Sequence, residues 1–357
     1  MSQRVAIVGI GQTYFRSKRP DVNIPEMCHE AVRAALEDAN LEAKDIDTVV
    51  YGNMELFEGC YQVEMWQSDY IGGYLKPGTR VATGGTTGAS TGVTAIEYAA
   101  SGLADVVLAL GFEKQSEGDS RLGLALAGGQ DPTRDRTLFF GAIGPSARAA
   151  TAYMRKSGCK EEHAAMLRLR IDRCACKNPH AHLKLGLKTI EEVLNSPYLV
   201  TPLRLLDMCP TSEGACAIIV ASEEKARKIT NKPVWVKDWE VMHNFDFGSG
   251  GFDGLTHTEA SRILYKRNGI TNPRRDLSCV ELYDPATYIH LDFIECLGLC
   301  EKGEAWKLEE KGFWDLDGEC PTDPSGGVIA TNAIGGTALL RQAEVALQLR
   351  GDAGDYQ

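Results

Sequence analysis

The sequence predicts an α/β protein made of two similar halves, because strand and helix patterns alternate and one helix–turn–strand unit occurs twice. Short uninterrupted apolar runs, typical of buried strands, lie at 5–9, 106–110 and 216–221. Helical patterns separate these runs, which favours mainly parallel sheets covered by helices on both faces. With 357 residues, 43% of them hydrophobic, the chain is long enough to bury a large core.

The repeated unit consists of an amphipathic helix, a stop residue, a polar turn and a strand. In the first half the helix spans 24–40, and the strand follows the turn at 45–47 and ends at Tyr51. In the second half the helix spans 258–268 and stops at Gly269, and the strand is expected at 276–282. We therefore predict a duplicated α/β unit, with an N-terminal half at 1–230, including an insertion at 115–206, and a C-terminal half at 231–357.

The charge balance and hydropathy exclude several classes of protein. The formal net charge is −11, whereas nucleic-acid and anionic membrane surfaces require clustered Lys and Arg. No apolar stretch approaches 18 residues, and the first strand follows the N-terminus without a leader pattern. We expect a soluble cytoplasmic protein that binds neither nucleic acid nor membrane.

The 11 cysteines are scattered, several of them inside apolar segments, as is typical of reduced buried thiols. Cys174 and Cys176 precede His180 and His182, which resembles a metal-binding pattern. However, helix residues two positions apart point to different faces, so helix-end packing is the favoured interpretation. We expect no metal in this chain.

A glycine-rich turn, 84–88, separates a short apolar segment from a helical pattern. The turn therefore lies at a helix N-terminus, where free backbone N–H groups favour developing negative charge. Oxygen atoms that gain charge during a reaction are stabilised at such a position.

Four collinear segments resemble the thiolase superfamily, in particular its sterol-carrier-associated and archaeal branch. They lie at 80–114, 195–222, 282–305 and 324–351, and include Gly-Phe-Glu-Lys at 111–114. The resemblance implies a duplicated five-layer αβαβα sandwich whose insertion forms a loop domain over an acyl-CoA tunnel. It also implies coenzyme A as substrate or thioester carrier, a homodimer, and a small accessory protein with an OB fold and a zinc ribbon. Relatives continue with final strands beyond the position at which this sequence ends, Gln357.

The resemblance also locates the expected site, and this chain departs from the family there. Thiolases use a nucleophilic Cys, a His in a His-Asp segment and a His in a Gly-His-Pro loop; here Gly85, Tyr283 and Asn332 occupy those positions. Ala333 stands at the Pro of the loop. The residues expected to hold the substrate or the thioester oxygen are Thr86, Gly88, Gly335 and Gly336.

Without a thiolate at position 85, an acyl-enzyme cannot form there, but an enolate next to a thioester can still be stabilised. The chain resembles thiolase-like aldolases, which also carry Gly for the Cys and Tyr-Asp for His-Asp. Tyr283 is therefore expected to act as base or hydrogen-bond donor, and the alternative is a packed strand-end aromatic. His290 and Cys209 are weaker candidates, since a core His and a buried structural thiol are the commoner roles.

Three functions remain open from the sequence. The first is aldol-type cleavage or formation of a carbon–carbon bond beside an acyl-CoA thioester. The second is thiolysis of a bulky β-ketoacyl-CoA, as the resemblance to benzoylsuccinyl-CoA thiolase subunits implies. The third is a CoA-binding or scaffolding subunit without catalysis.

Overall fold

The computed structural model describes residues 3–127, 133, 141–243 and 254–357. Its centre is a six-stranded sheet in the order β3-β2-β4-β7-β1-β8. The strands are β1 (Val5–Gln12), β2 (Thr48–Gly52), β3 (Gly78–Val81), β4 (Val106–Glu113), β7 (Gly214–Ser222) and β8 (Val234–Trp235). Apolar residues fill β1, β2, β4 and β7, so the strands predicted in the first half are confirmed.

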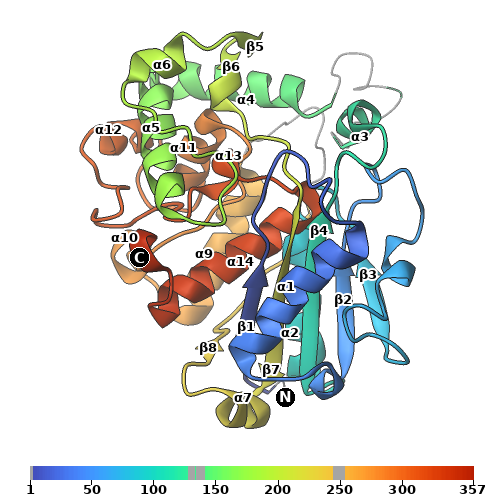
Figure 1. Ribbon diagram of the computed structural model, residues 1–357. Helices are drawn as coiled ribbons and strands as arrows, with labels where there is room; N and C mark the ends of the chain where they lie inside the picture. The colour runs from blue at the N-terminus through green and yellow to red at the C-terminus, as the bar shows by residue number, and fades with distance from the viewer. Residues whose placement is uncertain (1–2, 128–132, 134–140, 244–253) are drawn as a thin grey trace.

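Helices cover both faces of this sheet (Figure 1). On one face, α1 (Ile24–Ala39) packs against Ala6 and Val8 of β1. On the other face, α2 (Thr87–Ser101) and α14 (Ile334–Arg350) pack against each other and against Val5 and Ile7. Alternate residues of β1 therefore enter different cores, as the period of a strand requires.

The expectation of a mainly parallel sheet is wrong. Strand β2 pairs in parallel with β3 and β4, but β7 is antiparallel to both β4 and β1, and β8 is antiparallel to β1. Strand β7 follows the insertion and enters the sheet between β4 and β1, running against both. A mixed sheet results.

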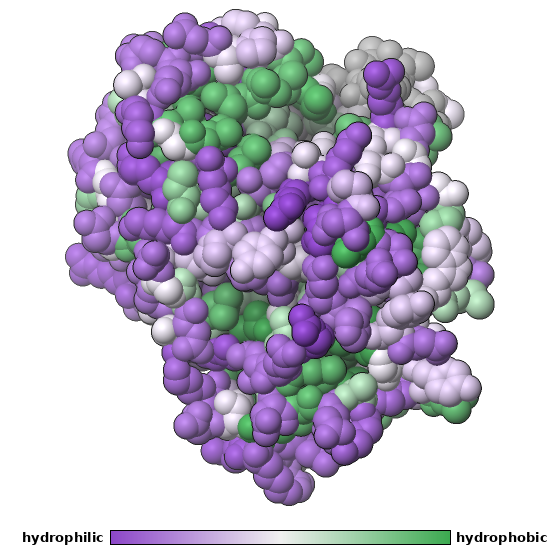
Figure 2. All heavy atoms as spheres, viewed as in Figure 1, coloured by the Kyte–Doolittle hydropathy of each residue, from purple (hydrophilic) through white to green (hydrophobic). Residues whose placement is uncertain are grey.

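The insertion forms a mostly helical layer beside one end of the sheet (Figure 1). Its elements are α3 (Ser120–Leu126), α4 (Ile143–Ser157), α5 (Glu161–Lys177), α6 (Ile190–Leu194), β5 (Tyr198–Val200), β6 (Leu203–Arg204) and the 3₁₀ turn η3 (Leu205–Asp207). Apolar side chains gather over this layer in Figure 2, and Leu199, Val200 and Leu205 are exposed there. Two further 3₁₀ turns, η1 (Ala43–Asp45) and η2 (Val63–Trp66), flank β2.

The second half is mainly helical in the described part of the chain. The first half ends with α7 (Glu223–Ile229). The second half contains α9 (Leu255–Asn268), α10 (Pro273–Asp276), α11 (Thr287–Cys296), α12 (Ala305–Glu309), α13 (Gly327–Ala330) and the 3₁₀ turn η4 (Gly354–Tyr356). The repeated helix is confirmed: α1 is followed by Asn40 and α9 by Gly269, both left-handed.

The strand expected at 276–282 is wrong. This segment forms one isolated bridge, between Val280 and Thr322. Backbone pairing is made by Val280, whose N–H donates to the Pro321 carbonyl over 2.9 Å and whose carbonyl accepts from the Asp323 N–H over 2.8 Å. The Leu282 N–H donates instead to the Asp323 carboxylate over 2.6 Å. Of the two sheets that the duplicated sandwich implies, the described residues form the first, and the small β5–β6 pair is a separate sheet within the insertion.

No helix in the described ranges is both long and apolar enough to cross a membrane.

Candidate active site

Gly85 and Tyr283, 198 positions apart in the sequence, meet at the start of α2. A Cβ atom placed on Gly85 would lie 3.1 Å from the Tyr283 hydroxyl oxygen and 3.3 Å from the nearest ring carbon. Such contacts are tighter than ordinary van der Waals packing, so with a side chain at position 85 the tyrosine would have to shift by a few tenths of an ångström. The tyrosine hydroxyl thus lies in tight contact with the position that a Cβ of residue 85 would take, beside the helix N-terminus.

Tyr283 is half-buried, and its hydroxyl makes no hydrogen bond to any residue in the described part of the chain. Burial raises the pKa of the Tyr283 phenol well above its usual value, and nearby Cys209 and Glu113 add to this effect. The hydroxyl therefore stays protonated at neutral pH and is available as a hydrogen-bond donor.

Asn332 lies in the same region and is held on several sides. Its side-chain oxygen accepts a hydrogen bond from the Thr337 hydroxyl over 3.1 Å, and its backbone N–H donates to Ser212 Oγ over 3.0 Å. Its amide nitrogen donates to Cys209 Sγ over 3.2 Å. The Ser212 hydroxyl in turn lies 2.9 Å from Nδ1 of His182. Ser212 and Thr337 are supporting residues that the sequence reasoning missed.

Cys209 is half-buried next to Asn332. Burial raises the pKa of its thiol to about 12, although the hydrogen bond from Asn332 opposes this shift. At neutral pH the group is a thiol rather than a thiolate, and the thiolate is the reactive form. The structure thus brings Cys209 close to Tyr283 without activating it as a nucleophile.

Three of the predicted substrate-binding glycines lie where backbones pack closely. A Cβ on Gly88 would lie 2.4 Å from the backbone nitrogen of Leu339 in α14, and one on Gly336 would lie 2.8 Å from the Gly111 carbonyl oxygen. The Gly335 N–H donates to the Glu113 carboxylate over 2.7 Å. These glycines allow α14 to approach α2 and β4, and the Gly335 N–H already has an acceptor.

Glu113, in the Gly-Phe-Glu-Lys segment, is a buried supporting residue that the sequence reasoning did not single out. Its second carboxylate oxygen accepts a hydrogen bond from the Asn53 amide over 3.0 Å. Thr86 is the residue that precedes α2 and is exposed; its hydroxyl donates to the Thr83 carbonyl over 2.7 Å. The Gly84–Thr86 side of the turn is thus open to solvent, while Gly88 is buried.

The contacts of the His290 ring are with residues outside the Gly85 turn. It is fully buried on α11, with Nδ1 2.6 Å from Asp284 Oδ2 and Nε2 3.0 Å from Thr322 Oγ1. Burial opposes charge on the ring, but the carboxylates of Asp284 and Asp323 outweigh it and raise the pKa of His290 to about 9. The protonated ring donates to Asp284 and to Thr322.

Asp284, His290 and Asp323 form the one group of potential metal ligands whose atoms come together in the described ranges, within 4.8 Å of one another. His290 Nδ1 pairs with both carboxylates, at 2.6 Å from Asp284 Oδ2 and 3.4 Å from Asp323 Oδ2, while Arg170 pairs with Glu309. The cysteine–histidine pattern at 174–182 does not gather into such a group: Cys174 is buried, Cys176 is exposed, and His180 stacks on Tyr14.

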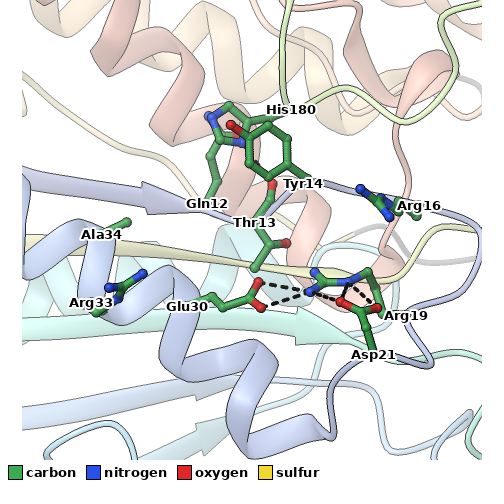
Figure 3. A pocket seen from close by; sticks show the side chains of 10 residues that line it. All are labelled: Gln12, Thr13, Tyr14, Arg16, Arg19, Asp21, Glu30, Arg33, Ala34 and His180. Carbon is green, nitrogen blue, oxygen red and sulfur yellow. Dashed lines mark hydrogen bonds and ion pairs between the residues drawn. The ribbon is translucent and has the colours of Figure 1, made fainter.

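A separate cavity of about 420 Å³ lies between the end of β1, α1 and His180 (Figure 3). Arg19 on its wall donates to both Asp21 and Glu30, so these three side chains form an ion-pair cluster. None of the predicted site residues lines this cavity.

Comparison with known proteins agrees with this fold. The chain matches the model of the thiolase N-terminal domain over residues 5–138 and that of the thiolase C-terminal domain-like family over residues 255–357. An acetyl-CoA acetyltransferase from Methanothermobacter thermautotrophicus is 32% identical, over 99% of this chain and 92% of its own length. The benzoylsuccinyl-CoA thiolase subunit BbsB from Thauera aromatica is also 32% identical, over 100% and 92%.

Among solved structures, the Ltp2-ChsH2(DUF35) aldolase superposes with a TM-score of 0.82 and 28% identity, over 99% of this chain and 91% of that chain. The chain belongs to the thiolase superfamily. Within the superfamily it is a member of the sterol carrier protein 2-like group, and its relatives include both acyltransferases and an aldolase.

Proposed function

We propose that this protein cleaves or forms a carbon–carbon bond beside an acyl-CoA thioester by an aldol-type reaction, without an acyl-enzyme at position 85. The observation that carries the proposal is the approach of Tyr283 to Gly85: the nucleophile's side chain is absent, and a tyrosine hydroxyl lies 3.1 Å from the position that its Cβ would take. Two of the three departures from the thiolase pattern, at positions 85 and 283, lie against each other, because a Cβ at position 85 would be in tight contact with the tyrosine.

In the cleavage direction a β-hydroxyacyl-CoA passes the proton of its hydroxyl group to solvent water, which reaches the exposed Gly84–Thr86 side of the turn, and the bond between its α and β carbons breaks. The β carbon leaves as a carbonyl compound, and the α carbon retains the electron pair as an enolate of the thioester. N–H groups in the first turn of α2, other than that of Thr87, which donates to the Gly84 carbonyl over 3.0 Å, stabilise the enolate oxygen, since first-turn N–H groups have no acceptors within a helix. A proton then reaches the α carbon and yields a shorter acyl-CoA.

Tyr283 acts in this scheme as a donor. Its raised pKa keeps the phenol protonated, so it donates a hydrogen bond to the oxygen that carries charge in the transition state. Asn332, fixed by Thr337, presents its amide N–H next to Cys209 and is the second polar group of the site. Thr86, Gly88, Gly335 and Gly336 then shape the turn and its packing around the thioester.

Coenzyme A serves as the carrier of the acyl group, and we propose that a small partner protein completes the acyl site. Support comes from the aldolase neighbour, whose name joins a second protein, ChsH2(DUF35), to the thiolase-like chain. Exposed Leu199, Val200 and Leu205 on the insertion offer an apolar surface for such a partner. A homodimer and a zinc ribbon in the partner complete the proposed assembly.

Dependence on free CoA separates the proposed reaction from thiolysis. A panel of β-hydroxyacyl-CoA and β-ketoacyl-CoA substrates would be incubated with the protein, with and without free CoA, and acyl-CoA products would be followed by mass spectrometry. Aldol cleavage releases acetyl-CoA, or a substituted analogue, and an aldehyde or ketone from the β-hydroxy substrate without free CoA. Cleavage of β-keto substrates only, and only with free CoA, would support thiolysis instead of the aldol-type reaction.

Thiolysis keeps one observation in its favour: the BbsB relative is a thiolase subunit by name and is 32% identical over the whole chain. Its mechanism here would require CoA to attack directly, since the buried Cys209 is not a thiolate at neutral pH. A subunit that binds CoA without catalysis would give no product with either substrate class.

A further inference from the structure

The Tyr283 hydroxyl has no hydrogen-bond partner in the part of the chain that the structure describes, so its position depends on its backbone. The residues on both sides of it are anchored by buried carboxylates. Before it, the Leu282 N–H donates to Asp323 Oδ1 over 2.6 Å. After it, Asp284 Oδ2 lies 2.6 Å from His290 Nδ1. Asp284, His290 and Asp323 are all inaccessible to solvent.

A second set of contacts ties the same segment to α14. The Glu281 carboxylate accepts hydrogen bonds from the Ser325 N–H over 2.9 Å and from the Ser325 hydroxyl over 2.8 Å. Arg341 of α14 pairs with Glu281 and also donates to Ser325. Because the first turns of α14 also hold Asn332 through Thr337, the two polar groups of the site share one support.

Fold stability alone is a weak explanation for these contacts. Burying several charges is costly, and replacing buried ion pairs by apolar residues is often neutral or stabilising. Precise placement is a better explanation, since a displacement of about 1 Å at a reacting group can cost about 100-fold in rate. The buried groups converge on the three residues 281, 282 and 284, which flank Tyr283.

We propose that Asp284, His290 and Asp323 form a positioning unit that holds the Tyr283 hydroxyl over Gly85. His290 is then a positioning residue that acts through Asp284 and does not touch the substrate. This inference rests on the proposed function, in which Tyr283 donates to the reacting oxygen.

Two substitutions of His290 separate its two hydrogen bonds. In His290→Asn the side-chain amide is placed to replace the Nδ1–H and still donate to Asp284. In His290→Gln the longer side chain replaces Nε2 and keeps Thr322, but loses the Asp284 contact. We expect His290→Gln to lower kcat about tenfold with an unchanged KM, and His290→Asn to stay within about threefold of wild type.

A double-mutant cycle with Tyr283→Phe shows whether the effect passes through the tyrosine. Adding His290→Gln to Tyr283→Phe should lower kcat no further, because the group that it positions is gone. Tyr153→Phe is a matched control, since it removes one buried hydrogen bond from α4 to Glu295 of α11 but leaves 281–284 untouched. Its kcat should remain at the wild-type value, and thermal melts would confirm that each variant folds.

A readout without substrate is hydrogen exchange of the peptide that contains residues 280–286. Exchange should accelerate at least fivefold in His290→Gln and stay near wild type in His290→Asn. Equal kcat and equal exchange in wild type and His290→Gln would overturn the inference, and so would a further tenfold loss in the Tyr283→Phe background. If Tyr283→Phe itself retains full turnover while exchange behaves as expected, it is the proposed function that fails.

Discussion

The surface around Tyr283 and the cluster around His290 are neighbours in the second half, because Asp284 directly follows Tyr283 in the sequence and contacts His290. The two regions nevertheless differ in burial and in hydrogen bonding. Tyr283 is half-buried, its hydroxyl lacks a partner in the described ranges, and it faces an exposed glycine turn. His290 is fully buried, and both ring nitrogens have partners. An unsatisfied polar group beside an open turn indicates a site, whereas a satisfied and buried one indicates support.

The largest expected effect concerns Tyr283, the half-buried residue beside the exposed turn. Tyr283→Phe removes only the hydroxyl and keeps the packing of the ring, so the fold should be unaffected. Removing a donor to a developing oxyanion typically costs about 100-fold in turnover. Steady-state kinetics on the substrate identified by the CoA-dependence panel measure this change. Turnover within about twofold of wild type would remove Tyr283 from the mechanism.

Two glycines of the same helix end provide a sharper comparison. Gly85→Ala places a methyl group 3.1 Å from the Tyr283 hydroxyl oxygen, and we expect about a tenfold loss of turnover with little loss of stability. Gly88→Ala places a methyl group 2.4 Å from a backbone atom of α14, which should cost about 1–3 kcal/mol of unfolding free energy. Denaturant titration and kinetics on both variants give the two readouts. The reverse pattern would show that position 85 is structural and position 88 functional.

A smaller effect is expected at the nearby thiol. Because the raised pKa of Cys209 keeps it protonated at neutral pH, Cys209→Ser should retain turnover within about threefold. Kinetics of this variant, with a thermal melt as the control for folding, provide the measurement. A loss of more than 100-fold would instead assign the nucleophile to Cys209.

The smallest expected effect concerns the buried cluster around His290. The pKa of His290 is about 9 in the folded protein and 6.5 ordinarily, so protonation stabilises the fold. This contribution is complete below pH 6.5 and is lost as the pH rises through about 9. Thermal melts across that range should show a falling midpoint, and His290→Asn should flatten the fall. A slope that the variant leaves unchanged would mean that other groups cause it.

Particular residues show what could be predicted from the sequence. The buried strands and the repeated helix followed from local apolar patterns. Gly85 and Tyr283 became site candidates through motifs that resemble the family; the structure brings the two together, and their catalytic roles stay predictions. The strand at 276–282 failed because Asp323, about 40 residues later, takes the Leu282 N–H, and no local pattern records that contact. The mixed sheet was also missed, since strand direction depends on where β7 enters after the insertion.

The supporting residues of the site could not be predicted from the sequence for the same reason. Ser212 and Thr337 are ordinary hydroxyl residues in the sequence, and only the fold places both against Asn332. His290 is a weak site candidate from the sequence, because it follows Tyr283 on a predicted helix, and its proposed role depends on burial among Asp284, Asp323 and Thr322. Residue type indicates possible chemistry, and the fold decides which groups remain free for it.

The central claim, carbon–carbon bond chemistry without an acyl-enzyme, is tested most directly by intact-protein mass spectrometry during turnover. The protein would be mixed with a slowly reacting acyl-CoA, quenched in acid within the first turnovers and weighed, with Cys209→Ser in parallel. We predict an unmodified mass in both proteins while products accumulate. A covalent acyl adduct on wild type that forms and decays at the rate of turnover would contradict the claim, and its loss in Cys209→Ser would identify the residue that carries it.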